Sequence, residues 1–210
     1  MMHKKVVVSR GKDLKEAQKA LIMLHGRGAT AEDILSLGSY LKVPDFALLA
    51  PQASANTWYP YSFLANPQAN EPWLSSAIEV VGQLLEDVSK AGIPDGNIYF
   101  AGFSQGACLT LEFAARNARH YGGIIAFTGG LIGDSIRNEN YRGDFGGANI
   151  FIGTSDPDPH VPVERVRESA TVLERLNANV HVEIYNGMGH TISEAEIKLA
   201  NTIIFGNDVQ

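Results

Sequence analysis

Hydrophobic and polar positions follow two alternating patterns along the 210-residue chain. Short apolar runs with strand-forming residues are separated by longer segments in which apolar residues recur every three or four positions, as on one face of a helix. The predicted strands are residues 5–9, 20–24, 46–50, 97–101, 123–128, 149–153 and 180–185. The predicted helices are residues 30–41, 72–91, 105–118, 162–176 and 192–204.

Two helix starts carry a local signal of their own. Thr30-Ala31-Glu32-Asp33 places a hydroxyl three residues before a carboxylate, which is a capping pattern. Pro162 stands at the first position of another predicted helix, where its fixed backbone angle is favourable.

This alternation predicts an α/β fold with a mostly parallel central sheet and helices on both faces. The strands are apolar throughout and do not alternate with polar residues, as expected of strands covered on both sides. The length fits one domain, residues 1–210. Ligands of such sheets sit beyond the carboxyl ends of the strands, so the loops that follow strands are where chemistry is expected.

Composition and charge narrow the function classes. The chain is 45% hydrophobic and 19% charged, with a net charge of −6 and no basic block, which argues against nucleic acid or an anionic membrane as partner. No apolar run approaches the roughly 18 residues of a membrane span, and no secretory signal opens the chain. Cys108 is a single cysteine and cannot form an internal disulfide. We therefore expect a cytoplasmic protein without stable membrane insertion.

A serine stands between two glycines where a strand meets a helix, in Gly102-Phe103-Ser104-Gln105-Gly106. A sharp strand-to-helix turn projects such a serine into the active-site crevice and brings backbone close on both sides, so bulky neighbours are excluded. The helix N-terminus behind it offers free N–H groups to an oxyanion. Ser104 is therefore the predicted nucleophile.

A serine nucleophile needs a histidine as base, and in this arrangement the histidine comes last along the chain. His160, His181 and His190 are late enough. His181 fits a sheet-face residue inside a strand pattern, and His160 shares a loop with the candidate acid. His190 follows a strand in a glycine-rich loop, Gly187-Met188-Gly189-His190, and is the favoured base.

The loop after the strand at 149–153 offers the carboxylate. Asp156 is preferred, because one helix and one strand fit between it and His190; Asp158 is its competitor, and Asp134 a weaker one. Asp156, Asp158 and His160 could also suggest a metal site, but a capped, proline-stiffened turn explains them better and no further ligand cluster is visible.

The glycine-rich loop His25-Gly26-Arg27-Gly28, which follows the strand at 20–24, is suited to present a backbone N–H to a substrate carbonyl. We expect the backbone N–H groups of Arg27 and Gln105 to form the oxyanion hole, and His25 to be structural. Two interpretations of the Arg27 side chain are open. It either contacts an anionic substrate group or is a solvated or salt-bridged charge, and the second is favoured.

Residues 51–71 have no clear period and are rich in aromatics, which is unusual for a disordered linker. These residues either pack the loop onto the body of the protein or line one wall of a substrate pocket. Trp58, Tyr59 and Phe63 are the predicted substrate-binding residues, with Tyr61 beside them.

The motifs HGRG, APQA, WYP, GFSQG, GTSDPDPHVP and GMGH, in this order, resemble the phospholipase/carboxylesterase family of the α/β-hydrolase fold, which includes acyl-protein thioesterases. The resemblance implies a triad of Ser104, Asp156 and His190, oxyanion donors at Arg27 and Gln105, hydrolysis of carboxylic esters and, in some members, of thioesters or lysophospholipids, and no cofactor. A small-molecule ester is the expected partner, and a homodimer is left open.

Two departures from the family pattern matter. The family often has Asp-Pro, one or two residues, then Val-Pro, whereas this chain has a longer segment from Asp156 to Pro162, so Asp158 stays an alternative acid. Arg27 stands where thioesterase relatives tend to carry an apolar residue, which weakens an assignment to long-chain acyl substrates. With no room for a large cap domain, we expect an open, shallow site. A thioesterase or lactone hydrolase using the same site, and a non-catalytic binding module, are the alternatives.

Overall fold

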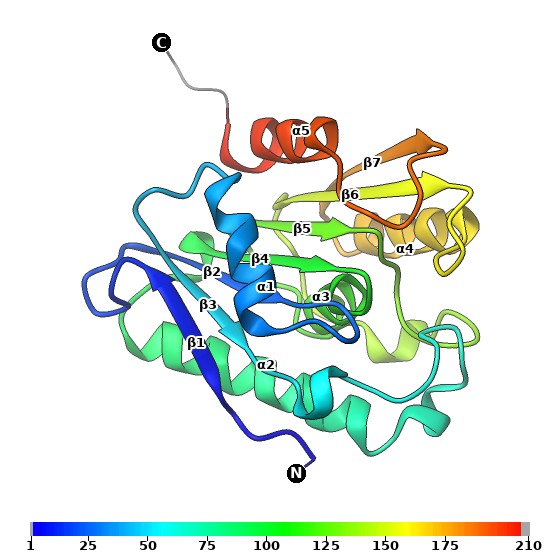
Figure 1. Ribbon diagram of the computed structural model, residues 1–210, viewed down its shortest axis with the longest axis horizontal. Coiled ribbons are helices and arrows are strands. Elements are labelled where there is room, and N and C mark those ends of the chain that lie inside the picture. Colours follow the sequence, from blue (N-terminus) through cyan, green and yellow to red (C-terminus); the bar gives the residue numbers. More distant parts are fainter. Residues whose placement is uncertain (1, 207–210) are drawn as a thin grey trace.

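The computed structural model describes residues 2–206, and its centre is a sheet of seven strands (Figure 1). The strands lie in the order β1-β3-β2-β4-β5-β6-β7. Only β1 is antiparallel to its neighbour, with Val7 opposite Pro51; every other pair is parallel. The strands are β1 (Val7–Gly11), β2 (Lys19–Leu24), β3 (Phe46–Pro51), β4 (Ile98–Phe103), β5 (Gly123–Phe127), β6 (Asn149–Asp156) and β7 (Asn179–Asn186).

The described residues also form five α-helices, four between strands and the last after β7. They are α1 (Ala31–Ser36), α2 (Trp73–Lys90), α3 (Gln105–Arg116), α4 (Val163–Arg175) and α5 (Glu194–Phe205). Short 3₁₀ turns occur at Leu37–Ser39, Ser54–Asn56, Pro67–Asn70, Asp95–Asn97 and Asn138–Asn140. Within residues 2–206, no helix combines the length and the apolar character needed to cross a bilayer.

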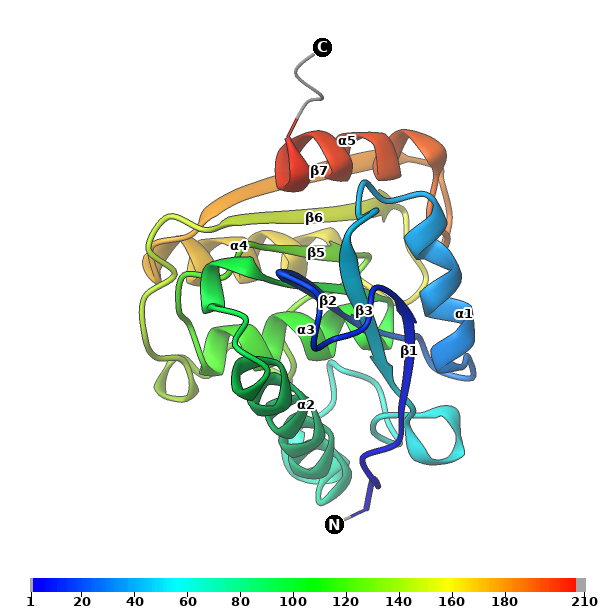
Figure 2. The ribbon, with the colours of Figure 1, turned by 90° about the vertical axis from the view of Figure 1, so that its left-hand side faces the viewer.

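The helices cover both faces of the sheet (Figures 1 and 2). Helices α1 and α5 lie on one face, and α2, α3 and α4 on the other. Successive residues of β2 alternate between the two faces: Ile22 packs in the cluster that includes α2 and α3, and Leu21 in the cluster that includes α1 and α5. Both faces of the central strands are therefore apolar, which is why their sequences carry no polar alternation, whereas the edge strands β1 and β7 are only partly buried and carry polar residues.

The seven predicted strands and five predicted helices are all present, and the α/β-hydrolase architecture is confirmed. Two boundaries differ in ways that matter. Helix α1 ends at Ser36, five residues earlier than predicted, and continues as the 3₁₀ turn Leu37–Ser39. Strand β6 runs three residues beyond its predicted end, to Asp156, and stays paired with β7 over that extension.

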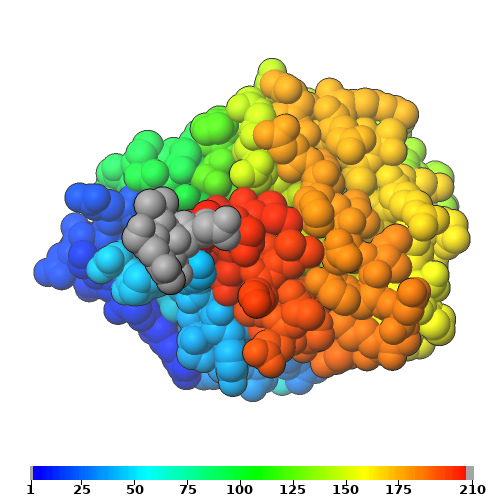
Figure 3. All heavy atoms as spheres, turned by 90° about the horizontal axis from the view of Figure 1, so that it is seen from above, coloured from blue at the N-terminus to red at the C-terminus, as the bar shows by residue number. Residues whose placement is uncertain are grey.

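Helix starts follow the local chemistry of the sequence. The predicted capping box at Thr30 forms, because its side chain accepts from the Asp33 N–H while the Asp33 carboxylate accepts from the Thr30 N–H. A second capping box at Ser193 and Glu196 opens α5, which begins directly after the loop that carries His190. Figure 3 shows α5, in red, at the surface between the light-blue segment that holds α1 and the orange segment that ends in β7.

Candidate active site

Ser104 lies at the turn between β4 and α3 with φ 54° and ψ −119°, a backbone conformation that residues other than glycine rarely adopt. The flanking glycines make this turn feasible. A Cβ on Gly102 would lie 2.5 Å from the carbonyl oxygen of Gly106, and a Cβ on Gly106 would overlap the carbonyl oxygens of Leu24 and His25. The Gly-x-Ser-x-Gly motif therefore forms the strained turn that the sequence predicts, with Ser104 half-buried between buried glycines.

His190 is held between a hydroxyl and a carboxylate. Its Nε2 lies 2.8 Å from Ser104 Oγ, and its Nδ1 lies 2.9 Å from Asp158 Oδ2. An ionised carboxylate only accepts hydrogen bonds, so Nδ1 carries the proton and Nε2 is left to accept from the serine hydroxyl. This arrangement has the order and the tautomer that a serine-hydrolase triad requires.

The carboxylate on His190 is Asp158, and the sequence-based preference for Asp156 is wrong about that contact. The reason is the longer course of β6. Asp156 is still part of the strand, in register with Asn186 of β7, and it is exposed to solvent. The chain turns toward His190 only beyond that residue, so the next aspartate is the one that reaches the imidazole.

Asp158 is stabilised in its ionised form. Burial by itself would raise the pKa of its fully buried carboxyl, but hydrogen bonds outweigh that effect and lower the pKa. The donors are the backbone N–H groups of His160, at 2.8 Å, and Val161, at 2.9 Å, together with His190. A charged Asp158 can orient His190 and stabilise an imidazolium there.

The other acid–base candidates lie elsewhere or face His190 differently. Asp134 accepts hydrogen bonds from Asn66 and Arg137. His181 lies on β7 with its ring stacked on Phe151, as a sheet-face residue would. His160 does reach the site, with its ring edge-on to that of His190 at a centroid distance of 4.8 Å. Among residues 2–206, no cluster of three potential side-chain ligands could hold a metal ion.

The two predicted oxyanion donors flank Ser104. Gln105 is the first residue of α3, where the backbone N–H has no partner inside the helix. The loop that carries Arg27 passes close to the serine: a Cβ on Gly26 would lie 3.6 Å from Ser104 Cβ. Within the described chain, the backbone N–H groups of Arg27 and Gln105 meet no protein acceptor, so both are available to a ligand.

The Arg27 side chain is exposed to solvent, in line with the favoured interpretation of a solvated charge, and it also makes a set of hydrogen bonds that the sequence did not predict. Its terminal nitrogens donate to the carbonyl oxygens of Tyr59, Pro60 and Tyr61 and to the hydroxyl of Thr57. The guanidinium therefore binds uncharged acceptors of the aromatic segment rather than a carboxylate.

The aromatic residues divide between core and cavity. The prediction that Trp58 binds substrate is wrong: its side chain is fully buried and its Nε1–H donates to the carbonyl oxygen of His25. Tyr59 and Phe63 do line a cavity of about 750 Å³ beside the serine, together with the largely exposed Tyr61. Ser104, Gln105, Asp158 and His190 also line it, as do residues 159–162 of the loop that follows β6.

Two positioning contacts were not predicted. The Ser155 hydroxyl accepts the Gly189 N–H at 2.9 Å, which ties the His190 loop to β6. The Phe103 ring lies beside His190 at a centroid distance of 5.2 Å. A serine at a strand end and a phenylalanine within the elbow motif are common residues, so their neighbours in sequence give no sign of these roles.

His25 and Cys108 are both buried, and Cys108 also borders the cavity beside Ser104. The His25 Nδ1 donates to the Gly26 carbonyl and its Nε2 accepts the Ala53 N–H; burial lowers its pKa, so the ring is neutral and structural, as expected. Burial raises the pKa of the Cys108 thiol to about 12.

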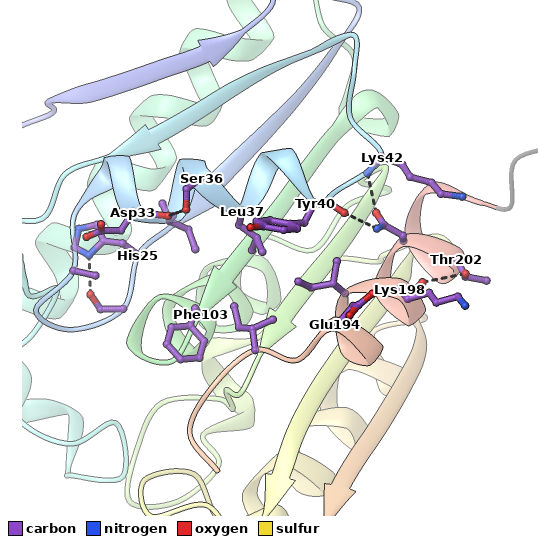
Figure 4. A pocket seen from close by; sticks show the side chains of 16 residues that line it. His25, Asp33, Ser36, Leu37, Tyr40, Lys42, Phe103, Glu194, Lys198 and Thr202 are labelled. Carbon is purple, nitrogen blue, oxygen red and sulfur yellow. Dashed lines mark hydrogen bonds between the residues drawn. The ribbon is translucent and has the colours of Figure 1, made fainter. Parts of the chain in front are cut away.

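A second, larger groove of about 1020 Å³ runs between α1 and α5 (Figure 4). Its lining includes Leu37 and Tyr40 near α1, and Glu194 and Lys198 on α5. Phe103 borders it as well, but Ser104, Asp158 and His190 do not. The groove is therefore separate from the candidate active site, which lies on the other side of the Phe103 ring.

Comparison with known proteins gives consistent matches. Residues 3–205 match the family model described as Phospholipase/Carboxylesterase. A crystal structure of phospholipase/carboxylesterase from Dyadobacter fermentans is 55% identical, with a TM-score of 0.96 over 98% of both chains. Acyl-protein thioesterase 1 of Kluyveromyces lactis is 27% identical over 87% of this chain and 89% of its own. The carboxylesterase of Bacillus cereus, 21% identical over 94% of this chain and 92% of its own, shares the fold with a TM-score of 0.76.

Proposed function

The chain belongs to the phospholipase/carboxylesterase family, a family of carboxylic ester hydrolases, and from that premise we propose that it hydrolyses small carboxylic esters through a Ser104–His190–Asp158 triad. The observation that carries the proposal is the hydrogen-bonded chain from Ser104 Oγ through His190 to Asp158, with contacts of 2.8 and 2.9 Å. The proposed hydrolysis requires no cofactor.

In the proposed mechanism, His190 Nε2 takes the Ser104 proton as Oγ attacks the ester carbonyl carbon. The negative charge on the carbonyl oxygen is stabilised by the backbone N–H groups of Arg27 and Gln105. The imidazolium, stabilised by Asp158, then gives its proton to the departing alcohol. Water hydrolyses the acyl-enzyme by the same proton transfers, releasing the acid and restoring Ser104.

Three variants test this assignment. Ser104→Ala is expected to lower kcat on the order of 10⁶-fold and to abolish labelling by a fluorophosphonate probe. Asp158→Asn is expected to lower kcat on the order of 10⁴-fold, because the amide leaves His190 without its orienting acceptor. Asp156→Asn, two residues earlier at the end of β6, is the matched control and should stay within about twofold of the wild type.

Turnover of p-nitrophenyl acetate and butyrate, with probe labelling followed by mass spectrometry, measures these outcomes. An unlabelled, inactive wild-type protein would favour a non-catalytic binding module. A loss at Asp156→Asn instead of Asp158→Asn would reverse the acid assignment. The acyl-protein thioesterase among the relatives makes an acyl-CoA the informative second substrate, since the same triad serves thioesters. A higher kcat/KM on the acyl-CoA would identify a thioesterase.

A further inference from the structure

The side chains of the two proposed oxyanion donors converge on one piece of chain, residues 57–61, which we call the 57–61 segment. The backbone of Arg27 and that of Gln105 flank Ser104 from different elements, a loop after β2 and the start of α3. Their side chains nevertheless both donate to the carbonyl oxygen of Tyr59, which lies 2.9 Å from Arg27 Nη2 and 2.8 Å from Gln105 Nε2.

Both terminal nitrogens of Arg27 donate hydrogen bonds to this segment. Nη1 donates to Thr57 Oγ1 at 3.0 Å and to the Pro60 carbonyl oxygen at 2.9 Å. Nη2 donates to the Tyr59 carbonyl oxygen and, at 2.7 Å, to that of Tyr61. Four acceptors match the four terminal N–H groups of a guanidinium, and only arginine offers this planar fork.

The Gln105 side chain also forms hydrogen bonds with the segment. Its Oε1 accepts the Trp58 N–H at 2.9 Å and the Thr57 hydroxyl at 3.3 Å, while Nε2 donates to the Tyr59 carbonyl oxygen. The Gln105 side chain is buried, so these contacts are shielded from water. The 57–61 segment thus spans the gap between the two elements that carry the donors.

We propose that Arg27 is a positioning residue whose guanidinium, through the 57–61 segment and Gln105, sets the spacing of the two oxyanion N–H groups. This proposal rests on the hydrolase function proposed above. Two backbone-linked hydrogen bonds also join the Arg27 loop to this part of the chain: Trp58 Nε1–H donates to the His25 carbonyl oxygen at 2.9 Å, and Gly28 N–H donates at 2.7 Å to the carbonyl oxygen of Asn56, just before the segment. The Arg27 guanidinium adds four hydrogen bonds to the segment, and they come from the same residue whose backbone N–H is the proposed oxyanion donor.

The same contacts link substrate recognition to the oxyanion hole. Tyr59 and Phe63 line the cavity beside Ser104, and Tyr59 also supplies the carbonyl oxygen that both side chains bind. Arg27 also lines this cavity and is exposed, but its terminal N–H groups are engaged by four uncharged acceptors, so an anionic acyl group would have to compete with the 57–61 segment for them.

Arg27→Lys tests the proposal, since it keeps the backbone N–H and the positive charge but loses the fork. We expect kcat on p-nitrophenyl acetate to fall roughly 10- to 100-fold, as for a small misplacement of an oxyanion donor, with KM changed by less than about threefold. Arg167→Lys, on the exposed side of α4, is the matched control and should behave as the wild type.

Two further readouts separate positioning from substrate binding. Methylguanidinium at millimolar concentration should restore part of the kcat of Arg27→Ala, and methylammonium should not. Hemisuccinate and acetate esters of p-nitrophenol should lose the same factor in kcat/KM with Arg27→Lys. A rise in KM confined to the anionic ester would overturn the proposal in favour of a substrate-binding arginine.

A milder variant guards against misfolding. Thr57→Val removes one acceptor of Arg27 and should lower kcat in the same direction by a smaller factor, with an unchanged melting temperature. Unchanged kcat in Arg27→Lys, or in both Arg27→Ala and Thr57→Val, overturns the proposal while wild-type labelling at Ser104 still supports the hydrolase assignment. An inactive, unlabelled wild type would instead reject the proposed function on which the inference rests.

Discussion

Glu196 is a buried carboxylate near the active-site loop, and it makes the stability of the protein depend on pH. It lies in the first turn of α5, fully buried, with its Oε1 packed against Gly153 of β6. Oε2 accepts the Ser193 N–H at 3.3 Å, while Oε1 has no hydrogen-bond partner among the described residues. Burial raises the pKa of Glu196 from 4.5 to about 7, and the Ser193 bond offsets only part of that effect.

The sign and the size of the effect follow from this shift. The folded state holds the Glu196 proton to higher pH than the unfolded chain, so the free energy of unfolding falls as pH rises from about 4.5 to 7. At about 1.4 kcal/mol per pKa unit, ionised Glu196 costs the fold about 3 kcal/mol at pH 8. Below pH 4.5 the side chain is neutral in both states and costs nothing.

Glu196→Gln removes this dependence while keeping the shape of the side chain. We expect the variant to match the wild type near pH 4.5 and to exceed it at pH 8 by up to about 3 kcal/mol, equivalent to roughly 6–12 °C in Tm. Urea unfolding and thermal melts from pH 4.5 to 8, with the difference between variant and wild type taken at each pH, measure it.

Glu194→Gln is the control, because Glu194 lies on the same helical turn but is exposed. Its difference from the wild type should stay flat with pH. A flat difference for Glu196→Gln as well, or one that grows toward acid pH, would refute the assignment of a buried carboxyl whose pKa is raised.

Two further predictions concern the elbow and the histidine loop. Gly106→Ala should destabilise the fold by at least about 1–3 kcal/mol, because the added Cβ would overlap the carbonyl oxygens of Leu24 and His25. Gly82, inside helix α2, is the control: a Cβ there would meet only the Phe113 side chain, at 3.7 Å, so Gly82→Ala should stabilise the fold by up to about 1 kcal/mol in the same melts. Ser155→Ala removes the acceptor of the Gly189 N–H and should lower kcat roughly tenfold, with little change in KM, because the His190 loop is less firmly held. Thr154→Val, at the buried neighbouring position, is the control and should leave kcat unchanged. Equal losses of kcat in the two variants would attribute the effect to strand packing instead.

Much of the fold could be read from the chain because its determinants are local. Apolar strands, helical periodicity and the capping residues at Thr30 are properties of neighbouring residues, and the elements they predict are present, although α1 is shorter and β6 longer than predicted. The elbow is local too: the spacing of Gly102, Ser104 and Gly106 is what a tight strand-to-helix turn requires. His190 could be predicted as the base because chain order and a glycine-rich loop after a strand narrow the choice.

The choice between the two aspartates depended on where β6 ends, and strand ends are decided by pairing with a neighbouring strand. Because β7 stays paired through Asn186, Asp156 remains in the sheet and Asp158 reaches His190. One signal was present in the chain: Asp158-Pro159-His160-Val161-Pro162 has the Asp-Pro-x-Val-Pro spacing of the family pattern without any insertion.

The division of the aromatic residues and the role of the Arg27 side chain were decided by tertiary structure alone. Trp58 and Tyr59 are adjacent in the chain and both are buried in the core, yet only packing decides that Tyr59 also borders the cavity. The sequence around Arg27 does not predict that its side chain binds acceptors some 30 residues away, because these acceptors are mostly backbone carbonyl oxygens, which every residue type has. The sequence therefore determined the elements and the elbow that presents Ser104, while contacts between distant segments decided which aspartate reaches His190 and what the Arg27 side chain binds.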